Sequence, residues 1–527
     1  MMRTLPVFAA ITLSIAAVCA SAQQTRLPDI GSSAGELLAP AQQAEYGSMM
    51  LAQLRAYGYV LDDPLVDSWL QSVGSRLAAS SDEPDHPFTF FMLRDRQFNA
   101  FATLGGYVGT NAGLVLAAES EDEVASVLSH EVAHVTQEHV LRSVERAQKD
   151  SVPILLAMLG AIAVAQSAGG SSADDGAMAA LAIGQGLSAQ RQIDYTRSNE
   201  AEADRLGIRT LARSGYKPTA MAEMFQRMQT VSRVNQGGVR DRTPDYLRTH
   251  PVTITRISEA KQRAEGLAPA KPTFGTGDGG TSLHPLLPSG LTLPASSFAD
   301  VGGQFGWARE RIRVLSAHTA AEAVREYRQR QRAGALSEAE SYGLAVAHLG
   351  ANQEAEAVAT FKPLLAAHPD DPWLVIGMAE AEARAGHQAA ADARFEALLK
   401  RMPEHRPTVL TYARVLAERD TPAAGRRAQE LLRPLLGRSK EDPVFQRTFA
   451  RISEIAGDPI RAGEAHAEAE YLYGRPERAL LQLNTLLKRD DLDYYGRARI
   501  EARIAAITPQ VLELRRQGVR DEVLERR

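Results

Sequence analysis

Apolar residues recur at every third or fourth position between residues 121 and 148, the period of an α-helix with one buried face. The residues with this spacing are Val124, Val127, Leu128 and Val135. Just before them, residues 120–123 read Ser-Glu-Asp-Glu. A serine followed three positions later by a glutamate is typical of a capped helix start. The pattern therefore predicts a helix from about residue 121 to about residue 148.

Similar patterns divide the rest of the amino-terminal half into helices and short strands. Helices are expected over residues 41–58, 64–79 and 185–213, the last ending before Gly215. Aromatic and β-branched residues predict strands at 88–93, 98–102 and 107–110, with a glycine turn at 105–106. The expected fold class is mainly α with a small β-sheet.

One segment is nearly continuous in its apolar character. Residues 153–165 contain almost only apolar side chains, and Gly and Ser dominate residues 169–172. The run is too short to span a bilayer comfortably. It is expected either to form a lid over a cleft, to contact a membrane surface, or to pack as an ordinary core helix.

The composition changes at about Gly266, where periodicity is lost and Gly, Pro, Ser and Thr become frequent. This change predicts a linker over residues 266–305. The chain is again helical from residue 306. Gly386 is followed by Ala391, Phe395 and Pro403 at the offsets of a tetratricopeptide repeat, whose length is about 34 residues. About four such repeats are expected to stack into an α-helical solenoid with a groove for a partner or an extended substrate.

The amino terminus has the features of a secretory signal peptide. Arg3 precedes an apolar stretch at residues 5–18, and small residues follow at 20–22. Cys19, the single cysteine, would be removed with the signal, so the mature chain has no disulfide. Lipidation of Cys19 is the less favoured alternative. The predicted segments are thus a signal peptide at 1–22, a first domain at 23–265, a linker at 266–305 and a repeat domain at 306–527.

Composition and charge narrow the function classes. Of the 527 residues, 44% are hydrophobic and 23% are charged, as in ordinary globular proteins. The formal net charge is -5, so the chain lacks the basic excess of nucleic-acid-binding proteins.

Residues 130–134 read His-Glu-Val-Ala-His, which is the HExxH pattern of zinc peptidases. His130 and His134 are four positions apart and share one helix face, so both imidazoles can bind one metal ion. Glu131 lies beside them, where its carboxylate can accept a proton from an attacking water. The sequence therefore predicts a zinc ion, one per chain, with Glu131 as the catalytic base.

Catalytic zinc usually has three protein ligands, so a third must come from elsewhere in the chain. Glu200 and Asp204 are also four positions apart, on the predicted helix at 185–213. Glu200 is the predicted third ligand. Asp204 is expected to accept a hydrogen bond from a liganding histidine and so to orient it. Glu202 is expected to face solvent.

His250 precedes Pro251, which is expected in the first turn of another helix. His250 could stabilise the oxyanion of the transition state. It could instead fill the open zinc position and keep the enzyme latent. A helix-capping histidine is the alternative without a functional role. Other histidines are interpreted as surface or packing residues: His86, His139, His284 and His466.

HExxH followed by ExxxD on a second helix is the gluzincin pattern, and four short sequence segments around it are more specific. They are Asn-Ala-Phe-Ala at 99–102, Gly-Gly-Tyr-Val-Gly-Thr at 105–110, Glu-Ala-Asp-Arg-Leu-Gly at 202–207 and Leu-Arg-Thr-His-Pro-Val-Thr at 247–253. With them the chain resembles the HtpX and CaaX-prenyl-protease family of zinc metallopeptidases, in its periplasmic branch with carboxy-terminal repeats. The resemblance covers nearly the whole mature chain. It implies zinc at His130, His134 and Glu200, with Glu131 as base.

The resemblance also implies where such an enzyme acts. It implies a periplasmic endopeptidase whose clients are unfolded or misassembled outer-membrane β-barrel proteins and whose partner is the β-barrel assembly machinery. A strand beside the metal is expected to dock the substrate backbone, within residues 99–109. Two alternatives stay open. One is a chaperone or scaffold with a latent protease site gated by His250, and the other is a membrane-associated protease of prenylated substrates.

Overall fold

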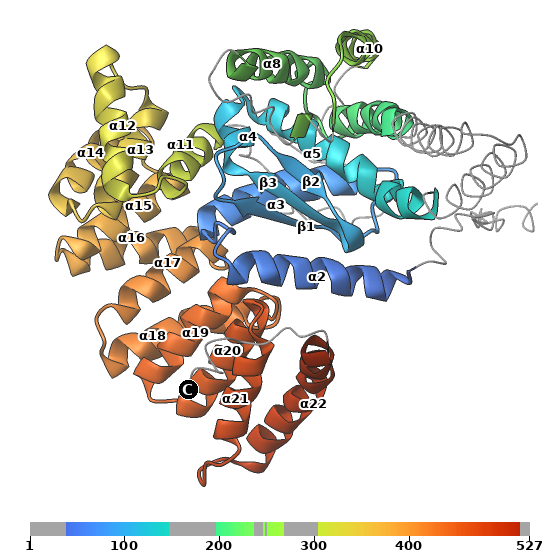
Figure 1. Ribbon diagram of the computed structural model, residues 1–527. Coiled ribbons are helices and arrows are strands. Elements are labelled where there is room, and N and C mark those ends of the chain that lie inside the picture. Colours follow the sequence, from blue (N-terminus) through green and yellow to red (C-terminus); the bar gives the residue numbers. More distant parts are fainter. Residues whose placement is uncertain (1–37, 147–195, 237–245, 248–249, 268–303, 517–527) are drawn as a thin grey trace, which may run out of the picture.

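The computed structural model describes residues 38–146, 196–236, 246–247, 250–267 and 304–516. These residues are mainly helical and include one three-stranded sheet, so the predicted fold class is confirmed (Figure 1). The signal segment, the apolar run at 153–165 and most of the predicted linker lie outside the described residues. Among the described residues, no helix combines the length and the apolar character needed to cross a membrane.

All three predicted strands are present: β1 (Thr89–Leu93), β2 (Ala100–Ala102) and β3 (Tyr107–Asn111). Strand β3 is central, parallel to β1 and antiparallel to β2, and a 3₁₀ turn (η1, Leu104–Gly106) joins β2 to β3. A side chain at Gly109 would collide with the rings of Phe101 and Phe91 on the flanking strands. The flanking strands are therefore held closely against β3. Strand β2 lies at an edge of the sheet, because β3 is its only partner among the described strands.

The helices of the first domain pack around this sheet. They are α2 (Pro40–Ala56), α3 (Pro64–Ala79), α4 (Ala112–Ala117), α5 (Glu121–Thr136), α8 (Thr219–Gln236) and α10 (Ile254–Glu265). Helix α3 packs on β1 and on α5, while α5 packs on β2. Buried Trp69 of α3 donates a hydrogen bond to the Glu121 carboxylate of α5 at 2.9 Å. This contact fixes the start of α5 relative to the core.

The predicted helix over residues 121–148 is interrupted. Ser120 caps its start as expected, accepting a hydrogen bond from the Glu123 N–H. Helix α5, however, ends at Thr136, because Glu138 adopts a left-handed conformation with φ of 50°. A new helical stretch begins at His139 and continues to residue 146, the last that the structure describes here. Apolar spacing continued across the break, so the sequence pattern did not reveal it.

The second predicted helix of the site is described over residues 196–213 and ends before Gly215, whose φ is 83°. It lies very close to α5. A side chain at Gly207 would come within 3.1 Å of the His130 backbone nitrogen. Glycine at this position lets the two helices approach each other, which brings their functional side chains together.

The carboxy-terminal half is a succession of helices. They are α11 (Phe305–Leu315), α12 (Ala320–Ala333), α13 (Glu338–Gly350), α14 (Glu354–Ala367), α15 (Pro372–Arg384), α16 (Gln388–Arg401), α17 (Arg406–Ala417), α18 (Pro422–Leu432), η3 (Arg433–Leu435), α19 (Pro443–Ala456), α20 (Pro459–Leu472), α21 (Pro476–Leu486) and α22 (Tyr494–Arg516). Helix α15 begins 34 residues after the start of α13, and α17 begins 34 residues after the start of α15. The helical region is as expected, and its membership in the tetratricopeptide family stays a prediction.

The two halves are packed on each other (Figure 1). Helix α11 contacts α3 and α4, and the buried Arg311 guanidinium makes two hydrogen bonds, of 2.8 and 2.7 Å, with the Asp63 carboxylate. Burial alone would raise the pKa of Asp63, but the charge of Arg311 lowers it. At the other end of the helical region, Tyr473 donates to Asp62 at 3.0 Å, and Gly474 lies against the Ala52 backbone of α2.

Candidate metal centre

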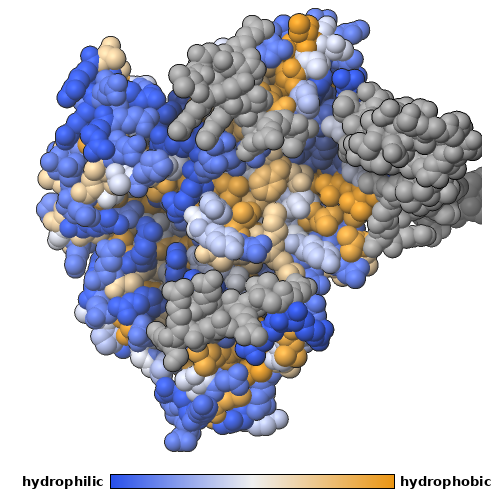
Figure 2. Space-filling model, viewed as in Figure 1, coloured by the Kyte–Doolittle hydropathy of each residue, from blue (hydrophilic) through white to orange (hydrophobic). Residues whose placement is uncertain are grey.

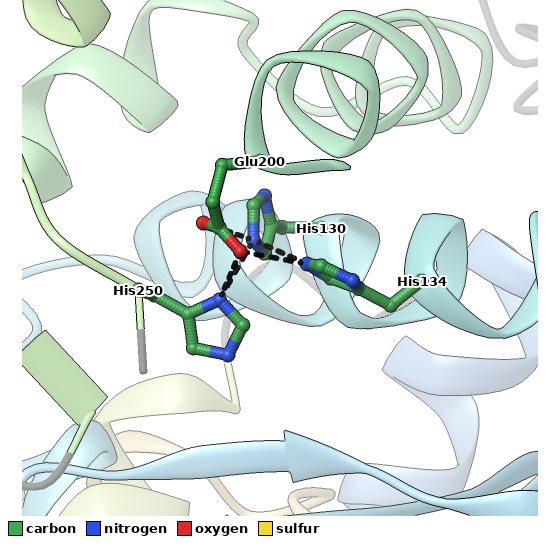
Figure 3. Close-up of side chains that lie close together, drawn as sticks. All are labelled: His130, His134, Glu200 and His250. Carbon is green, nitrogen blue, oxygen red and sulfur yellow. Dashed lines mark hydrogen bonds and ion pairs between the residues drawn. The ribbon is translucent and has the colours of Figure 1, made fainter. Parts of the chain in front are cut away.

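Four side chains converge at the crossing of α5 with the helix of residues 196–213. They are His130, His134, Glu200 and His250, and one potential ligand atom from each lies within 4.8 Å of all the others. In Figure 3, the two imidazoles of α5 face the Glu200 carboxylate, and His250 approaches from the loop before α10. All four were predicted site residues, and the structure brings them together.

The distances fit a single small cation. The Nε2 atoms of His130 and His134 are 3.0 Å apart. The Glu200 carboxylate lies 3.4 Å from His130 Nε2 and 3.3 Å from His134 Nε2. Two ligands at zinc–nitrogen distances on a tetrahedral ion are separated by about 3.3 Å. The donor set, two imidazoles and a carboxylate, is also the set that zinc peptidases use. The residues present therefore fit zinc.

The charge of the site also favours a cation. Burial alone would lower the pKa of His130, but the carboxylates of Glu200 and Asp204 outweigh it and raise that pKa to about 10. Burial and the positive charge of His130 lower the pKa of His134 to about 3. The pKa of Glu200 is lowered by His130 despite its burial. The buried carboxylates of Glu200 and Asp204 thus favour positive charge at the cluster, which a metal ion would supply.

Asp204 lies behind His130, as expected. Its Oδ1 atom is 2.9 Å from His130 Nδ1. Burial would raise the pKa of Asp204, but hydrogen bonds from His130 and Arg256 lower it. The carboxylate therefore stays charged, which holds the proton of His130 on Nδ1 and leaves Nε2 directed at the cluster.

Arg256 of α10 is a site residue that the sequence analysis missed. Its guanidinium donates to both Asp204 oxygens at 2.7 and 2.8 Å, and it lies 2.9 Å from Glu200 Oε2. It precedes Ala260, a buried position of the same helix, by one turn. An arginine on the buried side of a helix was the signal available in the sequence. Arg256 holds two carboxylates of the site in place.

Glu131 is 1% exposed, and its Oε1 atom makes no hydrogen bond within the described part of the chain. The Nε2 atom of His250 lies 3.9 Å from this oxygen. A buried carboxylate oxygen without a donor is costly unless a polar group binds there. Its position beside the ligand cluster suits a water molecule.

His250 is placed in the cluster and does not cap α10. Its Nδ1 atom lies 2.8 Å from Glu200 Oε1 and 3.4 Å from His130 Nε2, and its ring packs on Tyr246. Helix α10 begins at Ile254 and is capped by Thr253, whose side chain accepts from the Arg256 N–H. The capping alternative and the expected place of Pro251 in the first turn are therefore wrong.

Two further expectations need correction. His139 is not a surface or simple packing residue, because it is 3% exposed and its Nδ1 atom lies 2.8 Å from His134 Nδ1. Burial lowers the pKa of His139. Glu202 is only partly solvated, since its carboxylate lies 3.2 Å from His139 Nε2 and accepts from Arg142. The helix break at Glu138 produces these contacts, and the sequence pattern had not revealed it.

Comparison with known proteins identifies the family of the chain. The model of peptidase family M48 matches residues 64–264. A putative beta-barrel assembly-enhancing protease of Vibrio cholerae is 40% identical over 51% of this chain and 54% of its own length. The beta-barrel assembly-enhancing protease of Escherichia coli (strain K12) is 31% identical over 69% of this chain and 68% of its own. That of Yersinia pestis is 30% identical over 91% of both chains. The chain therefore belongs to peptidase family M48, a family of metallopeptidases that includes beta-barrel assembly-enhancing proteases.

Proposed function

We propose that this chain is a zinc-dependent endopeptidase of the periplasm that acts on outer-membrane β-barrel proteins during their assembly. The observation that carries the proposal is the buried cluster of His130, His134 and Glu200. Beside it lies a Glu131 carboxylate oxygen that makes no hydrogen bond within the described residues. Membership in a metallopeptidase family and the names of the relatives support it.

In the proposed reaction, His130, His134 and Glu200 hold the zinc ion. Zinc bound there would supply a Lewis acid that polarises the scissile carbonyl and makes a water molecule more acidic. Glu131 takes a proton from the attacking water and later donates it to the leaving amine nitrogen. Asp204 and Arg256 keep the ligands in position, since both contact ligand side chains directly.

Strand β2 is the proposed docking site for the substrate backbone. Of the segment expected for this task, residues 99–109, the β3 part is bonded on both sides and has no free edge. At one end of β2, the Asn99 C=O accepts a hydrogen bond from the Asn111 N–H, and at the other end the Thr103 N–H donates to the Tyr107 C=O. In an antiparallel ladder, only every second residue of a strand bonds to the neighbouring strand. The N–H and C=O groups of Ala100 and Ala102 therefore point away from β3. A peptide can add to this edge beside α5.

His250 supports a second state of the same enzyme. Its Nδ1 atom lies among the ligand atoms, at the fourth corner of the cluster. A site with four protein ligands has no open position for water. We favour this latency role over oxyanion stabilisation, because Nδ1 is directed at the cluster. In the latent state the chain acts as a chaperone or scaffold, with His250 as the gate.

The carboxy-terminal helices are proposed to bind clients or the assembly machinery. A cavity of about 1280 Å³ lies between α2 and the helices α19–α22. Its apolar lining includes Met49, Phe449 and Leu483, and its charged lining includes Glu468 and Arg503. Strands of membrane barrels alternate apolar and polar side chains. An unfolded strand could therefore place its apolar side chains inside the cavity and its polar side chains on the charged lining.

The metal is the first part of this proposal to test. Metal analysis of the purified chain is expected to give one zinc per chain, and Glu200→Ala or His134→Ala is expected to lower that content to a small fraction. Glu338→Ala, which removes an exposed carboxylate on α13, serves as the matched control and retains zinc. A parent chain without bound zinc and without measurable zinc affinity would contradict the proposal.

A further inference from the structure

His134 has a hydrogen-bonding partner of its own on the side opposite the metal cluster. Its Nδ1 atom lies 2.8 Å from Nδ1 of His139. The other nitrogen of His139, Nε2, lies 3.2 Å from Glu202 Oε2. Arg142 donates to the same carboxylate oxygen at 3.3 Å. A continuous chain of hydrogen bonds therefore runs from a predicted metal ligand toward the protein surface.

The backbone is shaped to allow this contact. In a continuous α-helix, a side chain five positions ahead is rotated by about 140° around the axis, so His139 could not face His134. Glu138 prevents α5 from continuing, because its φ is 50°, a backbone conformation that residues other than glycine rarely adopt. Helix α5 ends, and the next helical stretch starts at His139 itself. A strained residue next to a functional cluster is a common sign of a constraint on geometry.

The hydrogen bonds leave only one consistent arrangement of protons when His134 Nε2 is free to bind metal. Glu202 can only accept, so His139 donates its Nε2–H to it and keeps a lone pair on Nδ1. His134 then donates its Nδ1–H to His139, and its own Nε2 lone pair points at the cluster. His139 is almost fully buried, so water does not compete for these bonds.

We propose that His139, held by Glu202, is a positioning residue that fixes the ring orientation and tautomer of His134. Asp204 stands in the same relation to His130, at 2.9 Å from its Nδ1 atom. Each histidine of the HExxH motif thus has its own partner, one a carboxylate and the other a histidine backed by a carboxylate. This inference rests on the proposal that the site binds zinc.

The test measures zinc affinity of the full chain by competition with a chromophoric chelator. His139→Phe keeps the buried ring volume and removes both hydrogen bonds, and it is expected to weaken zinc binding by about 10- to 100-fold. His348→Phe is the matched control, because His348 on the distant helix α13 is also buried and its side chain hydrogen-bonds to Gln353, just before α14. The control is expected to bind zinc as the parent does.

A second series separates positioning from general support of the fold. Glu202→Ala changes a side chain that is 28% exposed, and it is also expected to weaken zinc binding. Because Glu202 acts through His139, the double variant should bind no more weakly than His139→Phe alone. His139→Gln, whose amide can both accept and donate, should recover part of the affinity. In Co²⁺-loaded protein, the d–d absorption bands should shift in His139→Phe and remain unchanged in His348→Phe.

The outcomes are distinct. Zinc affinities within threefold of the parent for both His139→Phe and Glu202→Ala would overturn the positioning role and leave the metal centre intact. Independent, multiplicative losses in the double variant would also overturn it. If His139→Phe does not fold, Glu202→Ala alone decides in the same way. A parent chain that binds no zinc would refute the proposed function itself, and this inference with it.

Discussion

For single residues, the spacing of side chains along a helix was enough to predict most members of the metal cluster. His130 and His134, and likewise Glu200 and Asp204, could be predicted to share a face because four positions make about one helical turn. Arg256 and His139 could not, since their contacts depend on how α10 approaches the site and on the break at Glu138. Local periodicity carries no information about either.

The position of His250 leads to a prediction at this scale. Replacing it by alanine removes the side chain at the fourth corner of the cluster while keeping the three predicted ligands. His250→Ala is therefore expected to retain zinc and to raise the rate of proteolysis by roughly tenfold or more, about 1.4 kcal/mol in activation free energy. Cleavage of a fluorogenic peptide measures this rate, with the exposed His368→Ala as control. A lower rate would assign His250 to the oxyanion instead, and an unchanged rate would remove it from the site.

At the scale of elements, the existence of the strands was predictable and their pairing was only partly so. The glycine turn at residues 105–106 predicted that the strands on either side of it pair, and β2 and β3 do so. The parallel pairing of β1 with β3 is a tertiary contact, and it is what makes β3 central and β2 the free edge. This distinction decides which part of residues 99–109 can bind a substrate.

The free edge can be tested through a single backbone group. Ala102→Pro removes an N–H that points away from β3, so the ladder of the sheet keeps its hydrogen bonds. If substrates add to β2, kcat/KM for a peptide should fall by roughly 3- to 10-fold, the worth of about one hydrogen bond. Ala102→Ser keeps the N–H and is the matched control. Equal kcat/KM in the two variants, with zinc content unchanged, would place the substrate elsewhere.

In the whole molecule, the described residues of the amino-terminal half and the carboxy-terminal helices are packed on each other. Buried Arg311 and Asp63 join them at one end, and Tyr473 joins them at the other. The cavity between α2 and α19–α22 results from this arrangement. The helical character of this region was predictable from the sequence. The cavity was not, because its walls come from α2, which ends at Ala56, and from helices that begin only at Pro443.

Figure 2 shows hydrophobic residues around the sheet and over the last helices, while the surface of α12–α14 is mostly hydrophilic. This contrast allows a controlled binding experiment. A photo-crosslinking residue at Phe449, which lines the cavity, is expected to capture a purified unfolded outer-membrane β-barrel protein. The same residue at exposed Ala355 on α14 is the control and should capture several-fold less. Equal capture at the two positions would show that the cavity is not the client site.

Hydrolysis that depends on Glu131 tests the proposed mechanism most directly. Cleavage of unfolded casein would be measured for the parent chain and for His250→Ala, each with and without Glu131→Gln and a zinc chelator. Cleavage is expected in at least the His250→Ala chain. Glu131→Gln is expected to lower it by about 10²- to 10⁴-fold while zinc stays bound, and chelation is expected to abolish it. Cleavage that persists in Glu131→Gln, or no cleavage by either chain that retains Glu131, would contradict the proposed mechanism.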